Sequence, residues 1–299
     1  MYLLHNFLID TYFEIPFMNK ASFEKKINQP IISVSRDQNI EIPKNFLDKE
    51  SHIESNLNYV RIYYSNIAYI EIFNGGSNII IKELFSKSNK FLFLSKFINH
   101  AMPFALYQKK KLMLHASGIS KSEEGILFMG SSGSGKSSLA ASFKDYQIIS
   151  EDSVCAEIEN EECFVSNSLP FVKLTPEIAN HLGYNKNESI ALPGDKKNRS
   201  YYGISKFVEK RIKIKKCYIL KWGDKFKIEP IKLKDFIASF LLSNYSSIPL
   251  NSCKESLAIQ HSYAAKFLSS VSIYSLIRKK DNLFGDNDFL KKHFISDKV

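Results

Sequence analysis

The sequence has few cysteines, and none of them is arranged as a metal ligand would be. The four are Cys155, Cys163, Cys217 and Cys253; no two have C-x-x-C spacing, and no paired histidine motif accompanies them. This pattern argues against a zinc site. A chain of 299 residues also needs no disulfide to hold a core together. We therefore expect the protein to work in a reducing compartment, the cytoplasm.

Long apolar runs and nucleic-acid-binding patterns are missing as well. No stretch reaches the length of a membrane span, and residues 1–10 lack the basic start and small-residue cleavage site of a signal peptide. The net charge is +10, but the densest lysine runs, at 109–111 and 206–216, do not alternate with aromatic residues. We expect a soluble protein with a solvated basic face, and neither a nucleic acid nor a membrane as partner.

The most informative motif lies at residues 130–137, which read GSSGSGKS and complete the pattern G-x-x-x-x-G-K-[ST]. A short apolar run at 125–129 precedes it and a helix-compatible segment at 138–143 follows, which is the strand–loop–helix context that this motif requires. A flexible serine-rich turn would share the composition but not these flanks. The sequence thus predicts a nucleotide-binding loop formed by Gly130, Ser131, Ser132, Gly133, Ser134, Gly135, Lys136, Ser137 and Ser138.

The chemistry expected of this loop is the binding of ATP with Mg²⁺. Its glycines allow successive backbone N–H groups to turn toward a phosphate, and the following helix presents its positive end to the same anion. Lys136 is placed to reach the β- and γ-phosphates, and the Ser137 hydroxyl to complete a Mg²⁺ shell.

An acidic pair, Glu151 and Asp152, follows an apolar strand fifteen residues after Lys136. Adjacent residues at a strand end point to opposite sides, so one carboxylate is expected to face the metal and the other the phosphate acceptor. An ordinary acidic turn at a strand end is the alternative interpretation.

The pattern of the whole chain predicts an α/β fold of α+β character. Residues 1–85 are expected to form a small β-rich N-terminal domain with strands at 60–64, 68–73 and 78–81, a hairpin turn at 74–77, and irregular structure at 33–54. A helical segment, 86–110, with a break at Pro103, connects it to a nucleotide-binding domain at 111–299. Within that domain the pattern favours strands at 111–120, 125–129, 146–158, 212–221, 226–230 and 271–277, helices at 232–245 and 253–270, and a fraying tail from 279.

Three segments together resemble the catalytic domain of the HPr kinase/phosphorylase superfamily, which shares its nucleotide-binding fold with phosphoenolpyruvate carboxykinase. They are LHASG at 114–118, the loop at 130–138, and ISED at 149–152. Weaker similarity is found at 168–176, in the basic loop 193–200 and in two late strands at 215–220 and 271–276, so that the resemblance covers residues 111–278. It implies a core of the HPr kinase C-terminal or phosphoenolpyruvate carboxykinase type.

The resemblance also implies roles for single residues. Ser137 and Asp152 would bind the metal, Glu151 would activate the acceptor hydroxyl, and His115 would lie near the transferred phosphoryl group. Most relatives have aspartate at the position of Glu151, and the longer side chain shifts the base. The basic loop would close on the nucleotide or hold the acceptor through Lys196, Lys197 and Arg199.

The function expected from these features is an ATP-dependent kinase that transfers the γ-phosphate to a hydroxyl, most readily a serine or threonine of a peptide or protein, or else a small molecule. Residues 153–205 lack the Arg-Gly-x-Gly signature of HPr kinases, so HPr is not the expected substrate and phosphorylase activity is not expected. The resemblance allows a homo-oligomer. Two alternatives remain, a carboxykinase-like decarboxylation and a non-catalytic nucleotide-binding module.

Overall fold

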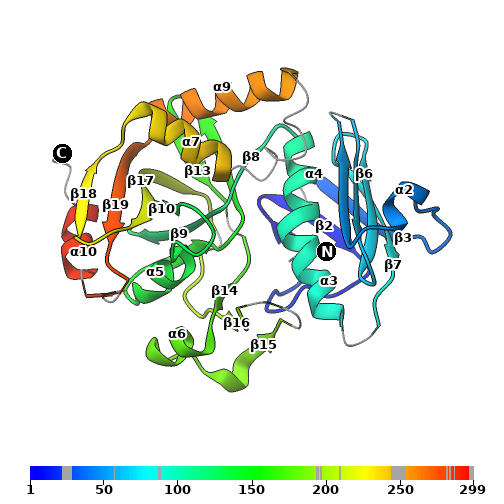
Figure 1. Cartoon of the computed structure of the whole chain (residues 1–299), viewed down its shortest axis with the longest axis horizontal. Helices are drawn as coiled ribbons and strands as arrows, with labels where there is room; N and C mark the ends of the chain where they lie inside the picture. Colours follow the sequence, from blue (N-terminus) through cyan, green and yellow to red (C-terminus); the bar gives the residue numbers. More distant parts are fainter. Residues whose placement is uncertain are drawn as a thin grey trace.

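The computed structural model describes residues 1–21, 29–56, 58–86, 89–166, 168–192, 195, 197–208, 210–243, 254–280, 282, 284–285 and 287–295. These residues form a mixed α/β structure with three sheets (Figure 1). Two large sheets lie on either side of a helical run, and the small third sheet lies below them in this view. Within the described residues, no helix is both long enough and apolar enough to cross a membrane.

The first sheet has seven strands from the N-terminal part of the chain. In spatial order they are β1 (Tyr2–Leu4), β2 (Phe7–Thr11), β3 (Ile31–Arg36), β7 (Asn78–Glu83), β6 (Ala68–Phe73), β5 (Val60–Tyr64) and β4 (Ser51–Ser55). The predicted strands at 60–64, 68–73 and 78–81 are confirmed. The expectation of irregular structure at 33–54 is wrong, because β3, the short helix α2 (Lys44–Leu47) and β4 all fall there. In β3 the buried Ile32 and Val34 alternate with exposed residues. Two buried apolar positions are too few to give a strong strand pattern in the sequence.

A helical run covers one face of this sheet. It consists of α3 (Lys90–Lys96), a π-helical turn η2 (Phe97–Ala101) and α4 (Met102–Gln108). Phe93, Phe97 and Met102 are buried in the core shared with the sheet. The predicted break at Pro103 does not occur, because this proline lies in the first turn of α4, where a missing backbone N–H is tolerated.

The second sheet has nine strands and carries the phosphate loop. In spatial order they are β11 (Gln147–Ser150), β9 (Ala116–Lys121), β10 (Glu124–Met129), β17 (Ile212–Trp222), β13 (Glu162–Val165), β12 (Val154–Glu159) and β8 (Leu112–Leu114), with β19 (Ser272–Arg278) beside β17 and β18 (Lys227–Pro230) beside β19. β10, β17 and β19 are parallel neighbours, and the other pairs are antiparallel.

Helices cover both faces of the nine-stranded sheet. Leu127 of β10 packs on the side of α7 (Leu233–Ser243) and α9 (Lys254–Ser270), and the next residue, Phe128, packs on the side of α5 (Lys136–Ser142) and α10 (Asn287–Ile295). This alternation is what a strand buried on both faces requires. The expectation of a fraying tail is wrong for α10, because its apolar side chains Leu290 and Phe294 are buried against the sheet.

Two of the predicted strands are interrupted at the same level of this sheet. The predicted strand at 111–120 is split at His115 into β8 and β9, and the one at 146–158 is split at 151–153 into β11 and β12. β9 pairs with β11, whereas β8 pairs with β12. Both segments therefore change direction together, which brings His115 beside the acidic pair.

The third sheet consists of β14 (Phe171–Leu174), β16 (Ser200–Gly203) and β15 (Ser189–Ala191), with α6 (Pro176–His181) and the 3-10 turn η3 (Lys186–Glu188) nearby in the chain. It contributes to both cores. Phe171 and Tyr201 belong to the apolar cluster of the seven-stranded sheet, whereas Val172 and Tyr202 belong to a cluster of the nine-stranded sheet. Alternate residues of β14 and β16 thus join the two large sheets.

Candidate active site

The loop at residues 130–137, called the phosphate loop from here on, links β10 to α5. Gly130, Gly133 and Gly135 have φ angles of 140°, 87° and 84°, which side chains rarely adopt. A Cβ on Gly130 would lie 2.9 Å from the Leu220 carbonyl oxygen, so the loop also needs glycine there for space. The Lys136 ammonium donates to the carbonyl oxygens of Gly130 at 2.9 Å and Ser131 at 3.3 Å.

Two side chains that the sequence analysis missed hold the loop from outside. The Trp222 indole Nε1 donates to the Gly133 carbonyl at 3.1 Å, and an Arg278 guanidinium nitrogen donates to the Ser134 carbonyl at 2.6 Å. The guanidinium carbon of Arg278 also lies 4.8 Å from the centre of a Trp222 ring. Both residues end parallel strands, β17 and β19, and the carboxyl ends of parallel strands meet at one sheet edge. That rule was the available signal for finding them.

The acidic pair divides between two sides. The Ser137 hydroxyl donates to Glu151 Oε1, whereas Asp152 forms an ion pair with Lys173 and lies 3.1 Å from His115 Nδ1. The sequence predicted Ser137 and Asp152 as paired metal ligands, whereas in the structure the Ser137 hydroxyl contacts the carboxylate of Glu151. Asp152 follows the end of β11 and has a left-handed backbone, φ 65°.

The environments of the two carboxylates push their pKa values apart. Burial, reinforced by the charge of Asp152, raises the pKa of Glu151 to about 7. Burial also opposes ionisation of Asp152, yet the charges of Lys173 and His115 hold its pKa well below the ordinary value. Burial lowers the pKa of Lys136 to about 8, against the opposing effect of the two acids. Such displaced values are typical of functional sites, although structural ion pairs also produce them.

The raised pKa of Glu151 predicts how stability depends on pH in the protein without ligands. Between pH 4.5 and about 7 the folded state keeps a proton that the unfolded state loses, so stability falls as the pH rises. Glu151→Gln does not titrate, and we expect its melting temperature to exceed that of the wild type at pH 8 by on the order of 5 °C and to match it closely at pH 5. Thermal unfolding measures this, with the exposed Glu188→Gln as control. An equal difference at both pH values would contradict the assignment.

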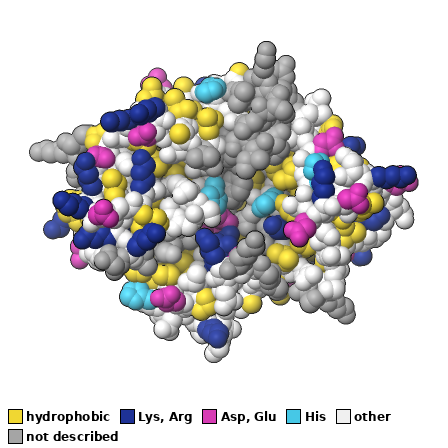
Figure 2. All heavy atoms as spheres, viewed as in Figure 1, with side chains coloured by type: hydrophobic (Ala, Val, Ile, Leu, Met, Phe, Trp, Pro, Cys, Tyr) yellow, Lys and Arg dark blue, Asp and Glu magenta, His cyan; other side chains and the backbone are white. Residues whose placement is uncertain are grey.

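Asp152 lines a cavity of about 410 Å³ beside the phosphate loop. Its walls come from the helical run, the breaks in the nine-stranded sheet at His115 and Asp152, β14 and three residues of the basic loop, Asp195, Lys197 and Arg199. We call it the acceptor cavity after the role that we propose for it below. Figure 2 shows basic, acidic and histidine side chains gathered near the middle of the viewed face, between the two large sheets. The residues that line the acceptor cavity are Leu92, Ser95, Lys96, Asn99, His100, His115, Asp152, Lys173, Leu192, Asp195, Lys197 and Arg199.

The basic loop is arranged by Asp195. Its carboxylate accepts hydrogen bonds from the backbone N–H groups of Lys197 and Arg199 and from the Arg199 guanidinium, at 2.6 to 3.3 Å. Lys197 Nζ lies 3.3 Å from the point that a Cβ on Gly133 would occupy, which places this ammonium over the phosphate loop. The structure thus brings Lys197 and Arg199 to the predicted site, while Lys196 lies outside the described residues.

Lys173 and the cavity wall from the helical run were also missed. Lys173 is a buried cation on β14, between the buried residues Val172 and Leu174, and an ionic residue at such a position is rarely buried without a partner. That interruption of an apolar run was a usable signal. Lys96, Asn99 and His100 belong to the helical run. The apolar spacing of this run predicted its buried face, but no pattern in the sequence marked these three polar residues.

The residues beside the phosphate loop fit a magnesium ion. Glu151 Oε2 is buried and has no hydrogen-bond partner among the described residues, and it belongs to the carboxylate that Ser137 contacts. A carboxylate and a hydroxyl are the hard oxygen donors that Mg²⁺ prefers, and its remaining positions are usually filled by substrate phosphates and water. Groups of three or more histidine, cysteine or acidic ligands are absent from the described part of the chain.

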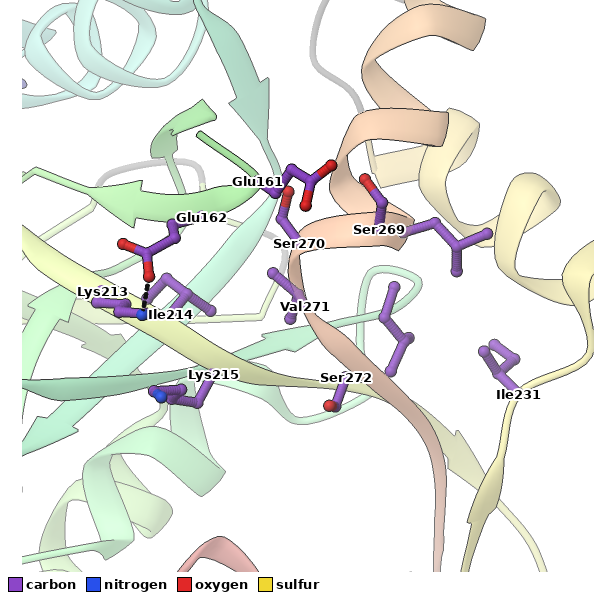
Figure 3. A pocket seen from close by; sticks show the side chains of 12 residues that line it. Glu161, Glu162, Lys213, Ile214, Lys215, Ile231, Ser269, Ser270, Val271 and Ser272 are labelled. Carbon is purple, nitrogen blue, oxygen red and sulfur yellow. Dashed lines mark hydrogen bonds and ion pairs between the residues drawn. The ribbon is translucent and has the colours of Figure 1, made fainter. Parts of the chain in front are cut away.

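A larger cavity, about 540 Å³, lies at the other end of β17 (Figure 3). Lys213 of that strand lines it and forms an ion pair with Glu162, while Trp222 beside the phosphate loop is nine residues further along the same strand. At about 3.3 Å per residue this separates the two sites by roughly 30 Å. The larger cavity is therefore no part of the candidate active site.

Comparison with known proteins finds a distant likeness among solved structures. No protein-family model and no curated protein matches the sequence. Among solved structures, the HPr(Ser) kinase/phosphatase from Coxiella burnetii is similar to this chain with 12% sequence identity and a TM-score of 0.31, over 61% of this chain and 96% of that one. These values describe a distant structural relationship.

Proposed function

We propose that this protein is a Mg²⁺-dependent kinase of the HPr-kinase-like type, which transfers the γ-phosphate of ATP to an acceptor hydroxyl on a peptide, a protein or a small molecule. The observation that carries the proposal is the division of two consecutive acids. Glu151 contacts Ser137 of the phosphate loop, and Asp152 lines the acceptor cavity. A nucleotide site and an acceptor site therefore adjoin at one point of the backbone, as phosphoryl transfer requires.

In this proposal the phosphate loop holds the nucleotide. Lys136, now bonded to loop carbonyls, turns to the β- and γ-phosphates, and Lys197 adds a second positive charge over the loop. Such cations stabilise the charge that spreads over the transferring group. Trp222 and Arg278 keep the loop in shape, because each donates to one of its carbonyl oxygens.

The geometry supports an exchange of the roles first expected for the two acids. Glu151, with Ser137, would hold Mg²⁺, which would supply positive charge to offset the negative charge that develops on the transferring phosphate. A bound cation also favours the ionised form of Glu151. Asp152 is the carboxylate on the acceptor side, and for a general base position counts before pKa.

The reaction that follows is a single displacement. The acceptor oxygen forms a bond to the γ-phosphorus, the bond from that phosphorus to the bridging oxygen of the β-phosphate breaks, and ADP leaves. The hydroxyl proton passes to a carboxylate oxygen of Asp152. Lys173 and His115 hold that carboxylate in place by an ion pair and a 3.1 Å contact.

The test is transfer from γ-labelled ATP in the presence of Mg²⁺ to a set of hydroxyl-bearing peptides and small molecules. The expected result is label on an acceptor oxygen together with an equal amount of ADP. Tight ATP binding with neither ADP nor labelled acceptor would favour the non-catalytic nucleotide-binding module. Formation of phosphoenolpyruvate from oxaloacetate would favour the carboxykinase-like alternative.

Nucleotide binding is predicted to change the fluorescence of Trp222, the single tryptophan of the chain. Its indole nitrogen donates to the Gly133 carbonyl, so an anion that reorders the loop alters the surroundings of the ring. Titration with MgATP or with Mg-tripolyphosphate should give a saturable change, because both present phosphates to the loop. Adenosine, which has no phosphate, is the matched control. An equal response to adenosine would contradict binding through the loop.

A further inference from the structure

The cations of the acceptor cavity are not equally matched by anions. Lys173 is paired with Asp152, Arg199 is paired with Asp195, and Lys197 lies over the phosphate loop. Lys96 is the remaining cation of the lining, and it forms no ion pair with any carboxylate that the structure describes. Its ammonium instead lies 4.6 Å from the centre of the Tyr64 ring.

The position of Lys96 is unfavourable for a positive charge in the ligand-free protein. The side chain is half-buried, and both burial and the neighbouring charge of Lys173 lower the pKa of Lys96. Burial, and then the charge of Lys96, lower the pKa of the nearby His100 to about 4. This ring is therefore neutral at pH 7 and does not alter the charge of this wall. An anion bound beside Lys96 would therefore compensate the positive charge on this wall of the cavity, which the helical run forms.

The same wall offers neutral hydrogen-bonding groups. The π-helical turn η2 directly follows Lys96 and carries Asn99 and His100 into the cavity lining. Among the described residues, the Asn99 amide nitrogen has two long contacts, 3.4 Å to Ser95 Oγ and 3.4 Å to the Tyr201 hydroxyl. Turns of this kind are often found at functional sites, because they displace side chains from regular helical positions.

We infer that the phosphate acceptor carries an anionic group of its own, a carboxylate or a phosphate, which Lys96 binds while the acceptor hydroxyl reaches Asp152. This rests on the proposed kinase function. Both residues line one cavity of about 410 Å³, a size typical of small-molecule sites, so the hydroxyl and the anion belong to the same small molecule or to neighbouring groups of a peptide. The N-terminal part of the chain, through α3, would then select the acceptor.

The experiment compares acceptors in pairs that differ only in the anion. Suitable pairs are serine and serinamide, glycerol 3-phosphate and glycerol, and serine peptides in which the residue after the serine is glutamate or glutamine. The charged member of a pair is expected to have the higher kcat/KM, by about 10- to 100-fold, as for a hydrogen bond to a charged group. Whichever pairs respond tell whether the acceptor is free or part of a peptide.

Lys96→Gln should abolish this preference, chiefly by raising KM for the charged acceptor, and should leave the neutral acceptors and MgATP binding unchanged. Lys96→Arg should restore part of it. Lys90→Gln, an exposed lysine at the start of the same helix, is the matched control. If Lys96→Gln lowered transfer to charged and neutral acceptors alike, Lys96 would have a structural role and the inference would be overturned.

Binding of the same pairs, measured by calorimetry with a non-hydrolysable ATP analogue and Mg²⁺, separates this inference from the kinase proposal. Binding that prefers the anion and depends on Lys96, without any transfer, would overturn the kinase activity and keep the anion site. Transfer with no preference for the charged acceptor would overturn the anion site and keep the kinase. Neither binding nor transfer would overturn both.

Discussion

Replacement of Lys136 by alanine is expected to lower kcat for phosphoryl transfer by about 10³-fold or more, the range found when one cation or donor at a transferring group is removed. The physical reason is that the ammonium is buried inside the phosphate loop, where its charge is poorly screened by solvent. Tripolyphosphate binding, followed through Trp222, should weaken as well. Initial rates with γ-labelled ATP measure the first effect.

Lys121→Ala removes an exposed lysine from the end of β9 and is the matched control. It should leave both the rate and tripolyphosphate binding within about two-fold of the wild type, because an exposed charge is screened by solvent and salt. Retention of the full rate by Lys136→Ala would show that the phosphate loop does not bind the transferred group. The proposed mechanism would then be wrong.

Asp152→Asn is expected to reduce kcat by about 10²- to 10⁴-fold, the usual contribution of a general base. The amide keeps the size of the side chain but cannot accept the proton. Raised Mg²⁺ should not restore this variant, because we propose that Glu151 and Ser137, rather than Asp152, hold the metal. Glu151→Gln should instead raise the Mg²⁺ concentration needed for half-maximal rate and recover part of its activity at high Mg²⁺. Rates measured across a Mg²⁺ series distinguish the two.

A fold control is needed because Asp152→Asn leaves Lys173 buried without its carboxylate, and breaking a buried ion pair costs about 3–5 kcal/mol. The double variant Asp152→Asn/Lys173→Met removes both charges and should regain stability in thermal unfolding without regaining activity. If Mg²⁺ rescued Asp152→Asn and failed to rescue Glu151→Gln, the roles would be those first expected from the sequence, with Asp152 on the metal.

The sequence predicted those parts of the site that depend on local order. The phosphate loop, the strand before it and the helix after it follow one another within twenty residues, so a linear pattern describes them fully. Most of the strands were also predicted, since alternating or continuous apolar residues specify them. The sequence did not predict which strands pair with each other. It therefore also did not predict the interruptions at His115 and at 151–153, which arise because each segment changes its pairing partner there.

The different contacts of the two acids and the cavity beside Asp152 could not be derived from the sequence. Opposite orientation of Glu151 and Asp152 was expected, but the sequence does not tell which of them faces Ser137. It also gives no sign of the left-handed backbone at Asp152, which many residues adopt only under tertiary constraint. Lys96, Lys173 and Asp195 are far apart in the chain and meet only when three separate parts of the structure pack together. The interrupted apolar run around Lys173 could have marked that one residue as unusual, but no local signal shows that the three residues line one cavity.

The small third sheet has a consequence for the exchange of parts between related proteins. Phe171 and Tyr201 are buried in the same apolar cluster as Phe93 and Phe97 of the helical run, and Asn99 contacts Tyr201. An N-terminal segment taken from another protein would meet foreign side chains at this seam and leave gaps or clashes there. Recombination that alters acceptor choice must therefore exchange β14 and β16 together with residues 1–110. The unit that is exchanged is then defined by packing in the core and not by continuity of the chain.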